Sequence, residues 1–358
     1  MTTGRLQGSV RVVGAGLIGT SIGLALTKLG VAVSLTDASP ANVSLAVDYG
    51  AGVPAGEGDN PSLIVVCVPP DVTAVTVRRE LENFPSAIVT DVASVKAPIL
   101  DELAAAAADL TRYVGSHPMA GREKGGAASG RADIFVARPW VIATQPQASD
   151  EALQLVEQLA LDLEAIPVRL SPLEHDRAVA LVSHTPQLVS SLLAARLVGA
   201  TGVELAGQGL RDTVRIAASD PKLWVQILGA NASEIVTVLK SLESDLGAVI
   251  EALEDLSKPG ALATLDQTIV NGNRGVESLP GKHGSRISQY STFVVMIGDQ
   301  PGELARLFNE IGEVGINVED LKLEHSPGAQ IGLVELSVLP GVGDRLVSEL
   351  TARGWRFA

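Results

Sequence analysis

The first half of the chain alternates between short apolar, β-branched runs and longer stretches rich in Ala, Leu and Glu. The apolar runs predict strands at residues 10–13, 31–36, 63–68, 87–91 and 140–143. The stretches between them have helical composition, and such alternation is typical of a parallel sheet with helices on both faces. We therefore expect a doubly wound α/β domain over residues 1–170.

The pattern becomes helical at residue 171. A capping box at 171–174 (Ser-Pro-Leu-Glu) begins one helix, and 219–221 (Ser-Asp-Pro) begins another in the same manner. Apolar residues then recur at steps of three and four, at Ile235, Val238, Leu242, Leu246 and Ile250. We expect an all-helical domain over 171–270, whose long apolar stripes predict a homodimer interface.

The last part of the chain predicts a third domain. Residues 271–290 are rich in Gly, Ser and basic residues and are expected to be a linker. The segment 291–358 then follows the order β-α-β-β-α-β, which predicts a ferredoxin-like α+β domain.

Composition narrows the class of protein. The 358 residues are 46% hydrophobic, which suits two or three folded domains. The net charge of −14 disfavours a nucleic-acid partner, because such a surface repels phosphates. The single cysteine, Cys67, excludes an internal disulfide and a cysteine-based zinc site, and no metal is expected. The longest uncharged stretch, 12–27, is shorter than the roughly 20 apolar residues of a membrane span, so we expect a cytoplasmic protein.

A Gly-x-Gly-x-x-Gly motif follows the first predicted strand and opens a helix, the arrangement that binds a dinucleotide pyrophosphate. Asp37 ends the next strand, where a carboxylate accepts ribose hydroxyls and repels a 2′-phosphate, so NAD is favoured over NADP. The predicted cofactor contacts are Gly14, Gly16, Leu17, Ile18, Gly19, Asp37, Val68 and Pro69.

Polar residues gather in a few further segments. They are Ser94 and Lys96, 115–121 (Gly-Ser-His-Pro-Met-Ala-Gly), 183–186 (Ser-His-Thr-Pro) and 211–221, which contains two arginines four residues apart. With the glycine motif, this set resembles the prephenate/arogenate dehydrogenase family from about residue 9 to the C-terminus. The segment 279–284 (Leu-Pro-Gly-Lys-His-Gly) is similar to members with a C-terminal ACT regulatory domain. We expect a monofunctional member, since little sequence precedes Val10.

The resemblance implies a Rossmann domain, a helical dimerisation domain and an ACT domain. Its chemistry moves a hydride from the ring carbon that carries the hydroxyl to NAD, while carbon dioxide leaves and the ring becomes aromatic. By resemblance His117 is the proton acceptor, and a neutral imidazole suits that role. Ser94 is expected to bond the same hydroxyl or His117; capping the following helix is its alternative.

The resemblance also implies a substrate-binding set. His184 holds the substrate side chain, Arg215 binds a carboxylate, and Glu123 gates the pocket; Arg211, one helical turn before Arg215, is a further candidate. The alternatives are a core histidine for His184, an ion pair between Arg211 and Asp212, and solvated loop charge for Glu123. His175, His283 and His325 are assigned no role.

The sequence therefore predicts NAD-dependent oxidative decarboxylation of prephenate to 4-hydroxyphenylpyruvate in tyrosine biosynthesis. Arogenate is the alternative substrate, and the neutral Gln187 favours prephenate. Two other classes are a β-hydroxyacid dehydrogenase, which would use a lysine base, and a non-catalytic NAD-responsive regulator. In the C-terminal domain, Asp299, Gly302 and Asn317 are predicted to bind an amino-acid effector, tyrosine or else phenylalanine, unless the domain only stabilises the oligomer.

Overall fold

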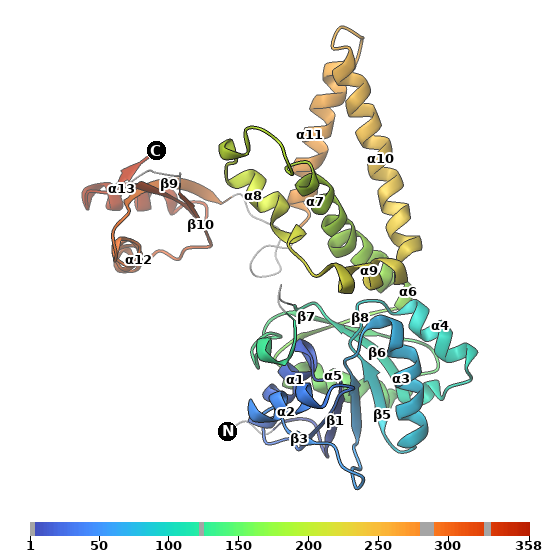
Figure 1. Cartoon of the computed structure of the whole chain (residues 1–358). Helices are drawn as coiled ribbons and strands as arrows, with labels where there is room; N and C mark the ends of the chain where they lie inside the picture. The colour runs from blue at the N-terminus through green and yellow to red at the C-terminus, as the bar shows by residue number, and fades with distance from the viewer. Residues whose placement is uncertain (1–3, 122–124, 280–289, 326–330) are drawn as a thin grey trace. The chain divides into compact units, whose positions relative to one another are not determined.

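The computed structural model describes residues 4–121, 125–279, 290–325 and 331–358. The chain forms two compact units (Figure 1). The first contains Met1–Ala200 and Thr213–Leu242, and the second contains Thr201–Asp212 and Glu243–Ala358.

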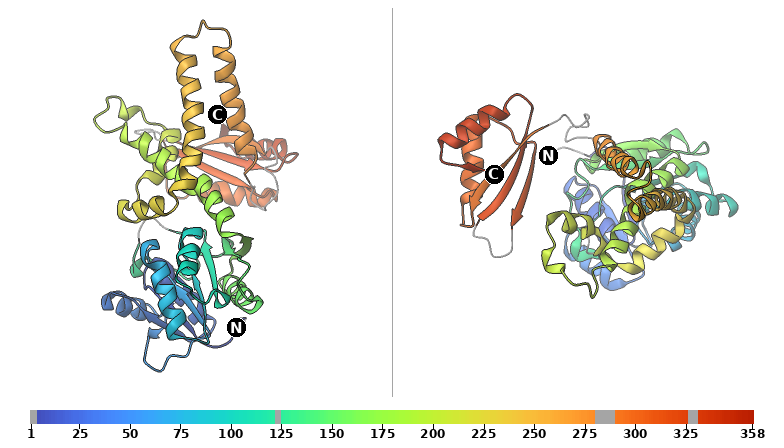
Figure 2. Two further views of the ribbon diagram at one scale, coloured as in Figure 1. Left: turned by 90° about the vertical axis from the view of Figure 1, so that its right-hand side faces the viewer. Right: turned by 90° about the horizontal axis from the view of Figure 1, so that it is seen from above.

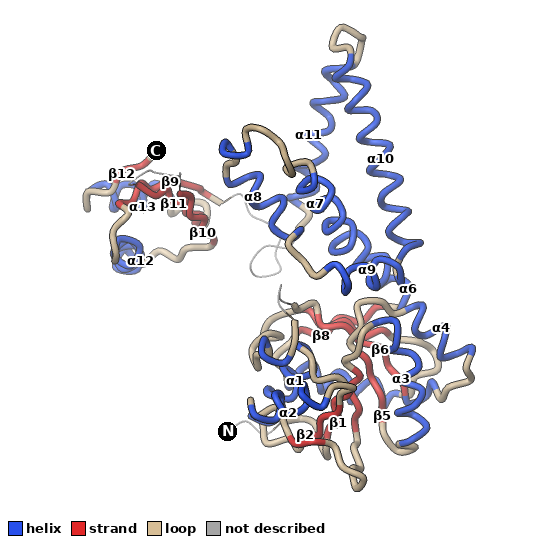
Figure 3. The backbone as a smooth tube through the Cα atoms, viewed as in Figure 1, coloured by secondary structure: helices blue, strands red, loops and turns tan. Residues whose placement is uncertain are grey.

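An eight-stranded sheet forms the centre of the first unit, in the order β3-β2-β1-β4-β5-β6-β7-β8. Its strands are red in Figure 3. The neighbours from β3 to β6 are parallel, β7 is antiparallel to β6, and β8 is parallel to β7. The strands are β1 Val10–Val13, β2 Val33–Thr36, β3 Val53–Pro54, β4 Leu63–Val66, β5 Ile88–Asp91, β6 Tyr113–Pro118, β7 Pro139–Ala143 and β8 Ile166–Leu170.

Helices cover both faces of this sheet, because its central strands are apolar on both sides. Every residue of β4 is buried, and its side chains alternate between two core clusters. Leu63 and Val65 lie in one cluster, and Ile64 and Val66 lie in the other. The helices are α1 Leu17–Lys28, α2 Pro40–Asp48, α3 Pro70–Asn83, α4 Ala97–Ala105 and α5 Asp150–Asp162, with short 3₁₀ turns at Leu110–Arg112 and Ala127–Ser129.

The doubly wound α/β prediction is confirmed, and the structure adds three strands to it. The short edge strand β3 and the strands β6 and β8 were not predicted. Gly115 and Pro118 weaken the strand pattern of β6, yet pairing with both β5 and β7 holds this segment extended.

The residues after 170 are helical, as predicted, up to Glu277. Ser171 and Glu174 form the expected capping box, and Asp220 caps α9 through the backbone N–H of Lys222. The elements are α6 Pro172–Val179, a π-turn Ala180–His184, α7 Thr185–Ala195, a 3₁₀ turn Val203–Leu205, α8 Gln208–Val214, a 3₁₀ turn Arg215–Ala217, α9 Pro221–Ala230, α10 Ala232–Glu254 and α11 Ala261–Glu277.

The helix from residue 172 to residue 195 is long and apolar enough to cross a membrane by length and composition alone. Its buried residues include the polar side chains of His175, Asp176 and His184. These side chains form hydrogen bonds within the first unit. The helix therefore packs as an element of that unit.

The expected linker at 271–290 begins later than predicted. Helix α11 continues through residues 271–277 despite Gly272 and Gly275, each of which costs a helix about 1 kcal/mol relative to alanine. Residues 280–289 lie outside the described part of the chain. The end of α10 and α11 form a helical hairpin that turns at Gly260, whose φ of 92° suits glycine (Figure 2).

The C-terminal residues have the predicted β-α-β-β-α-β order and the ferredoxin-like strand order β10-β11-β9-β12. Helices α12 and α13 pack on one face of this antiparallel sheet (Figure 2). Gly315 ends α12 with a φ of 71°, as expected of a left-handed C-terminal glycine. The elements are β9 Ser291–Gly298, α12 Glu303–Val314, β10 Asp320–His325, β11 Ile331–Val338, α13 Gly343–Ala352 and β12 Arg356–Phe357.

Candidate active site

The glycine-rich loop between β1 and α1 has the geometry of a phosphate-binding turn. Gly14 has a φ of 108°, and a Cβ there would lie 2.4 Å from the carbonyl oxygen of Cys67. A Cβ at Gly19 would lie 1.9 Å from the carbonyl oxygen of Gly14, so a side chain at either position would clash with backbone. At Gly16 a Cβ would meet no atom within 4 Å, and no described side chain caps α1. Open space beside free helix N–H groups fits a dinucleotide pyrophosphate.

Asp37 directly follows β2 and holds this loop. One carboxylate oxygen accepts the backbone N–H of Ala15 at 2.7 Å. The other accepts the backbone N–H of Ser39 at 2.8 Å and the side-chain amide of Asn42 at 3.2 Å. A carboxylate offers about four acceptor positions, so one is left for a ribose hydroxyl. The position therefore fits the predicted ribose contact, and Asp37 has the additional task of fixing the glycine-rich loop.

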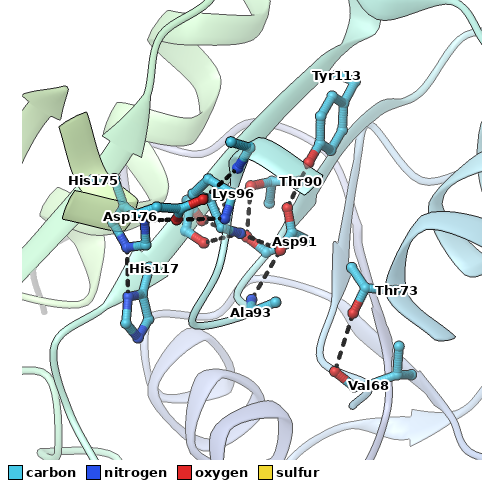
Figure 4. Close-up of polar contacts among 12 residues, drawn as sticks. Val68, Thr73, Thr90, Asp91, Ala93, Lys96, Tyr113, His117, His175 and Asp176 are labelled. Carbon is cyan, nitrogen blue, oxygen red and sulfur yellow. Dashed lines mark hydrogen bonds and ion pairs between the residues drawn. The ribbon is translucent and has the colours of Figure 1, made fainter. Parts of the chain in front are cut away.

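The other predicted cofactor contacts lie at the same edge of the sheet. Leu17 and Ile18 form the first turn of α1 and are partly exposed. Val68 and Pro69 follow β4, and the hydroxyl of Thr73 lies within hydrogen-bond distance of both of their carbonyl oxygens. Figure 4 shows the contact with Val68. These four residues are accessible at the carboxyl ends of β1 and β4, where ligands bind in sheets of this kind.

A buried ion pair lies at the end of β5. Lys96 is 1% exposed and Asp91 is fully buried, and the ammonium binds the carboxylate directly. Lys96 Nζ also donates to the backbone oxygen of Ser116 at 2.8 Å, and the hydroxyl of Tyr113 donates to Asp91 at 2.7 Å (Figure 4). Burial lowers the pKa of Lys96, against the opposing effect of Asp91. This pair fixes the backbone of β6 directly before His117.

His117 lies on β6, at the same edge of the sheet as the glycine-rich loop. The residue as a whole is partly exposed. Desolvation is the largest cause that holds the pKa of His117 well below the ordinary histidine value, and it is followed by electrostatic interactions with His175, Lys96 and His184. The imidazole is therefore neutral at pH 7, which is the form that accepts a proton.

Ser94 has a buried hydroxyl without a hydrogen-bond partner among the described residues. It neither bonds His117 nor caps α4. The first N–H groups at α4, those of Lys96 and Ala97, donate instead to the carboxylate of Asp176, each at 2.8 Å. A buried unpaired hydroxyl costs about 1–3 kcal/mol, so the free Oγ of Ser94 is suited to bonding a ligand.

His175, to which the sequence analysis assigned no role, contacts His117 directly. Its Nε2 lies 2.9 Å from Nδ1 of His117, and its Nδ1 lies 2.7 Å from Oδ1 of Asp176 (Figure 4). Both His175 and Asp176 are buried. A signal was present in the sequence: the capping box at 171–174 sets the helical register, which places these two polar residues on the same buried side as Val179.

His184 ends the π-turn and is 1% exposed. Its Nδ1 lies 3.1 Å from the amide nitrogen of Asn231, which also lies 2.8 Å from the backbone oxygen of Asp176. Because that oxygen only accepts, the amide nitrogen is the donor to both groups, and Nε2 of His184 carries the proton. Burial lowers the pKa of His184 to about 4. His184 is thus a neutral N–H donor at pH 7, held by Asn231, which the sequence analysis did not identify.

Arg215 is exposed on the 3₁₀ turn Arg215–Ala217, which packs against α7. Its guanidinium makes no ion pair with a described residue. Near this turn, the ring of Trp224 meets that of His184 edge-on, with centroids 6.2 Å apart. An unpaired guanidinium in the same unit as His117 and His184 is free to bind a carboxylate.

The roles of the remaining two substrate candidates, Arg211 and Glu123, stay predictions. Arg211 is exposed on α8 and belongs to the second unit. Asp212 accepts the side-chain amide of Gln208 at 2.7 Å, and no described ion pair joins it to Arg211. Glu123 lies outside the described residues, so its gating role stays a prediction.

The sheet order, the open glycine-rich loop and the neutral histidine at the same edge define a nucleotide-binding α/β protein of the Rossmann type. Among the residues that the structure describes, no three His, Cys, Asp or Glu side chains form a metal-binding group. Residues 22–168 match the family model of the prephenate dehydrogenase nucleotide-binding domain, and residues 171–267 match that of the dimerization domain. The chain belongs to the prephenate dehydrogenase family.

Individual relatives extend this result. The chain is 34% identical to the probable prephenate dehydrogenase NovF of Streptomyces niveus over 353 residues, which cover 96% of this chain and 98% of that one. A solved putative prephenate dehydrogenase from Corynebacterium glutamicum is 28% identical with a TM-score of 0.69, covering 77% and 91% of the two chains. A solved arogenate dehydrogenase from Synechocystis is 27% identical with a TM-score of 0.62, covering 75% and 99%. The similarity to NovF includes the C-terminal residues beyond both family models.

Proposed function

We propose that this chain is an NAD-dependent dehydrogenase that converts prephenate to 4-hydroxyphenylpyruvate and carbon dioxide, a cytoplasmic step of tyrosine biosynthesis. The observation that carries the proposal is the neutral, partly exposed His117 at the sheet edge where the glycine-rich loop leaves room for a dinucleotide. The family and the name of the relative NovF support the same reaction.

The reaction requires a base because a hydroxyl becomes a carbonyl while its ring carbon loses a hydride. NAD, when bound, supplies the hydride acceptor. Nε2 of His117 accepts the hydroxyl proton. The bond between the ring and its carboxylate then breaks, carbon dioxide leaves, and the electron pair makes the ring aromatic. The resulting phenolate takes the proton back from His117, so the complete reaction releases no proton.

Three further side chains suit the substrate. The unpaired guanidinium of Arg215 would bind a carboxylate through two parallel hydrogen bonds. The unpartnered hydroxyl of Ser94 would bond the reacting hydroxyl. The Nε2–H of His184 would donate to an oxygen of the substrate side chain. Arg211 and Glu123 stay candidates for the same site.

Prephenate and arogenate differ by a keto group and an ammonium on the side chain. A neutral N–H donor at His184 suits a keto oxygen and offers nothing to an ammonium, which also only donates. Steady-state assays with both substrates, each with NAD and NADP, test the proposal. The highest kcat/KM should be obtained with prephenate and NAD. Higher kcat/KM with arogenate would reassign the substrate, and no turnover of either would favour a non-catalytic NAD-responsive regulator.

Cofactor choice gives a prediction for Asp37. Asp37→Ala should raise the Kd of NAD roughly 10- to 100-fold, since hydrogen bonds to a charged group contribute about 1.5–3 kcal/mol, and should relax discrimination against NADP. Asp37→Asn is the matched variant: it removes the charge, and its amide oxygen can still accept the N–H of Ala15, although the amide nitrogen no longer accepts the N–H of Ser39. Both variants should gain relative affinity for NADP, measured by fluorescence titration. If the wild-type chain already binds NADP more tightly than NAD, Asp37 does not contact the ribose.

A homodimer is part of the proposal. Helices α10 and α11 expose apolar side chains that no described part of the chain covers, among them Leu246, Ile250, Leu253, Leu262, Ile269 and Val276. The matching family model is named for dimerization, and a second copy of this chain is the partner we propose. Sedimentation equilibrium should give twice the chain mass; a monomer at micromolar concentration would contradict it.

The C-terminal β-α-β-β-α-β domain is proposed to be an ACT regulatory domain that binds tyrosine or phenylalanine. Gly302 has a φ of 96° and begins α12, whose first N–H groups suit an amino-acid carboxylate. Asp299 is exposed in the turn before it. The side-chain amide nitrogen of Asn317 donates to the carboxylate of Glu319 at 2.9 Å. The amide oxygen of Asn317 therefore points away from Glu319 and can accept a hydrogen bond from the ammonium of the effector. Stabilisation of the oligomer is the alternative role.

Truncation after residue 285 separates these two roles. The truncated chain should fold, because the Synechocystis structure matches 75% of this chain over 99% of its own length. It should keep its activity and lose its response to tyrosine, because an effector acts only by binding one state of the enzyme better than another. Inhibition by tyrosine that is equal in both chains would place tyrosine in the active site, and circular dichroism checks the fold.

A further inference from the structure

A chain of hydrogen bonds leads from a buried carboxylate to His117 (Figure 4). The carboxylate of Asp176 lies 2.7 Å from Nδ1 of His175, and Nε2 of His175 lies 2.9 Å from Nδ1 of His117. His175 is fully buried and Asp176 is 1% exposed, whereas His117 is partly exposed as a residue. The chain therefore starts in the interior and ends at the candidate active site.

The donors and acceptors along this chain follow from its buried end. Both oxygens of Asp176 accept backbone N–H groups, from Lys96 and from Ala97, each at 2.8 Å. Because the carboxylate accepts, Nδ1 of His175 donates. A neutral imidazole with its proton on Nδ1 has a lone pair on Nε2, so Nδ1 of His117 donates in turn. This leaves the lone pair of His117 on Nε2.

The surroundings oppose the other arrangement, in which His175 is a cation that donates to His117. The ammonium of Lys96 lies close enough to lower the pKa of His117, and a second buried cation beside it would be costly. Among the described residues, the other ionisable groups beside the pair are His184, which is neutral at pH 7, and Asp91, which is already paired with Lys96. A neutral His175 between a carboxylate and His117 satisfies every contact.

We propose that His175 and Asp176 are positioning residues that hold His117 in the tautomer whose free Nε2 accepts the hydroxyl proton of the substrate. The tautomer follows from the contacts alone; its use in catalysis rests on the proposed function. The same contacts stabilise the imidazolium formed after proton transfer, because the charge on His117 is then bonded through His175 to a carboxylate. This assigns a task to two buried residues that act through His117.

The tautomer is measured directly on the full-length wild-type chain by long-range proton–nitrogen NMR of labelled histidine. The chain has five histidines, and the signals missing from a His117→Asn variant assign the ring of interest. The expected result is a protonated Nδ1 and an unprotonated Nε2 at pH 7. The opposite tautomer would overturn the proposal without any appeal to activity.

Asp176→Asn tests the catalytic consequence, because an amide nitrogen would face a backbone N–H and disturb the chain of hydrogen bonds. We expect kcat to fall roughly 100-fold, which is within the range that a general base usually contributes. The KM of NAD should be unchanged, and the tautomer of His117 should shift. Asp162→Asn is the matched control: Asp162 is also buried and accepts backbone N–H groups, those of Arg5 and Leu6, away from His117.

The two variants separate positioning from folding. If kcat decreases no more in Asp176→Asn than in Asp162→Asn, Asp176 has only a structural role and the proposal is wrong. His175→Gln and His175→Leu provide a second comparison, since only glutamine offers an acceptor to Nδ1 of His117; glutamine should retain more kcat. A wild-type chain without activity on prephenate or arogenate would refute the proposed function, while the NMR result would still decide the tautomer.

Discussion

Replacing His117 with asparagine will lower kcat roughly 10²–10⁴-fold, the usual contribution of a positioned general base. Asparagine keeps a polar side chain of similar size but has no nitrogen basic enough to accept the hydroxyl proton. The full size of this decrease should be observed at pH 7, because desolvation and the nearby His175 and Lys96 keep the wild-type imidazole neutral at that pH. Steady-state kcat with prephenate and NAD measures it.

The control makes the same chemical change elsewhere. His325→Asn, on β10, should leave kcat unchanged. The His117 variant should bind NAD with nearly wild-type affinity, because the loop at Gly14, Gly16 and Gly19 is intact. In the wild-type chain, activity should decline only as pH falls well below 6.5, the ordinary histidine value, since protonation removes the base and the pKa of His117 is lowered. Turnover near the wild-type value in His117→Asn would remove His117 from the mechanism.

Local pattern was sufficient to predict most of the fold. The strands β4 and β5 are buried along their whole length, β1, β2 and β7 are largely apolar runs, and α6 begins at the predicted capping box at 171–174. Where local signals conflict, tertiary contacts decided. β6 contains Gly115 and Pro118, and its extended form depends on pairing with β5 and β7, which are far away in sequence.

The candidate site was predictable to the extent that it lies in contiguous motifs. The glycine-rich loop and His117 were identified because their residue types carry chemistry at fixed spacing. His175, Asp176 and Asn231 were missed because their partners are distant: Asp176 binds the backbone at Lys96, and Asn231 binds His184. A capping box predicts where a helix begins and which residues share a face, but it does not predict what that face packs against.

These long-range contacts change how one predicted residue is understood. Ser94 was expected to orient His117 or to cap α4, and the structure assigns orientation to His175 and capping to Asp176. The hydroxyl of Ser94 is thereby left unpaired. A role in bonding the substrate hydroxyl is the part of the original expectation that fits this geometry, and it stays a proposal.

Arg215→Gln should raise the KM of prephenate by roughly 10- to 100-fold, the equivalent of about 1.5–3 kcal/mol of lost charge-assisted hydrogen bonding. Glutamine retains one donor but lacks the charge and the paired N–H groups that match a carboxylate. The chain has a net charge of −14, so an anionic substrate depends on a few local cations for binding, and the loss of one of them should weaken binding strongly. Arg215 is such a cation, because it is exposed and no described carboxylate pairs with it.

The effect should be found in KM more than in kcat, because the carboxylate is bound in both the ground state and the transition state. Arg177→Gln removes the same charge from the same unit, where Arg177 pairs with Glu234, and should leave the KM of prephenate nearly unchanged. Raising the salt concentration should weaken prephenate binding to wild type more than to Arg215→Gln, since screening acts on the charge that the variant lacks. An unchanged KM for prephenate together with weaker NAD binding would move Arg215 from the substrate site to the cofactor site.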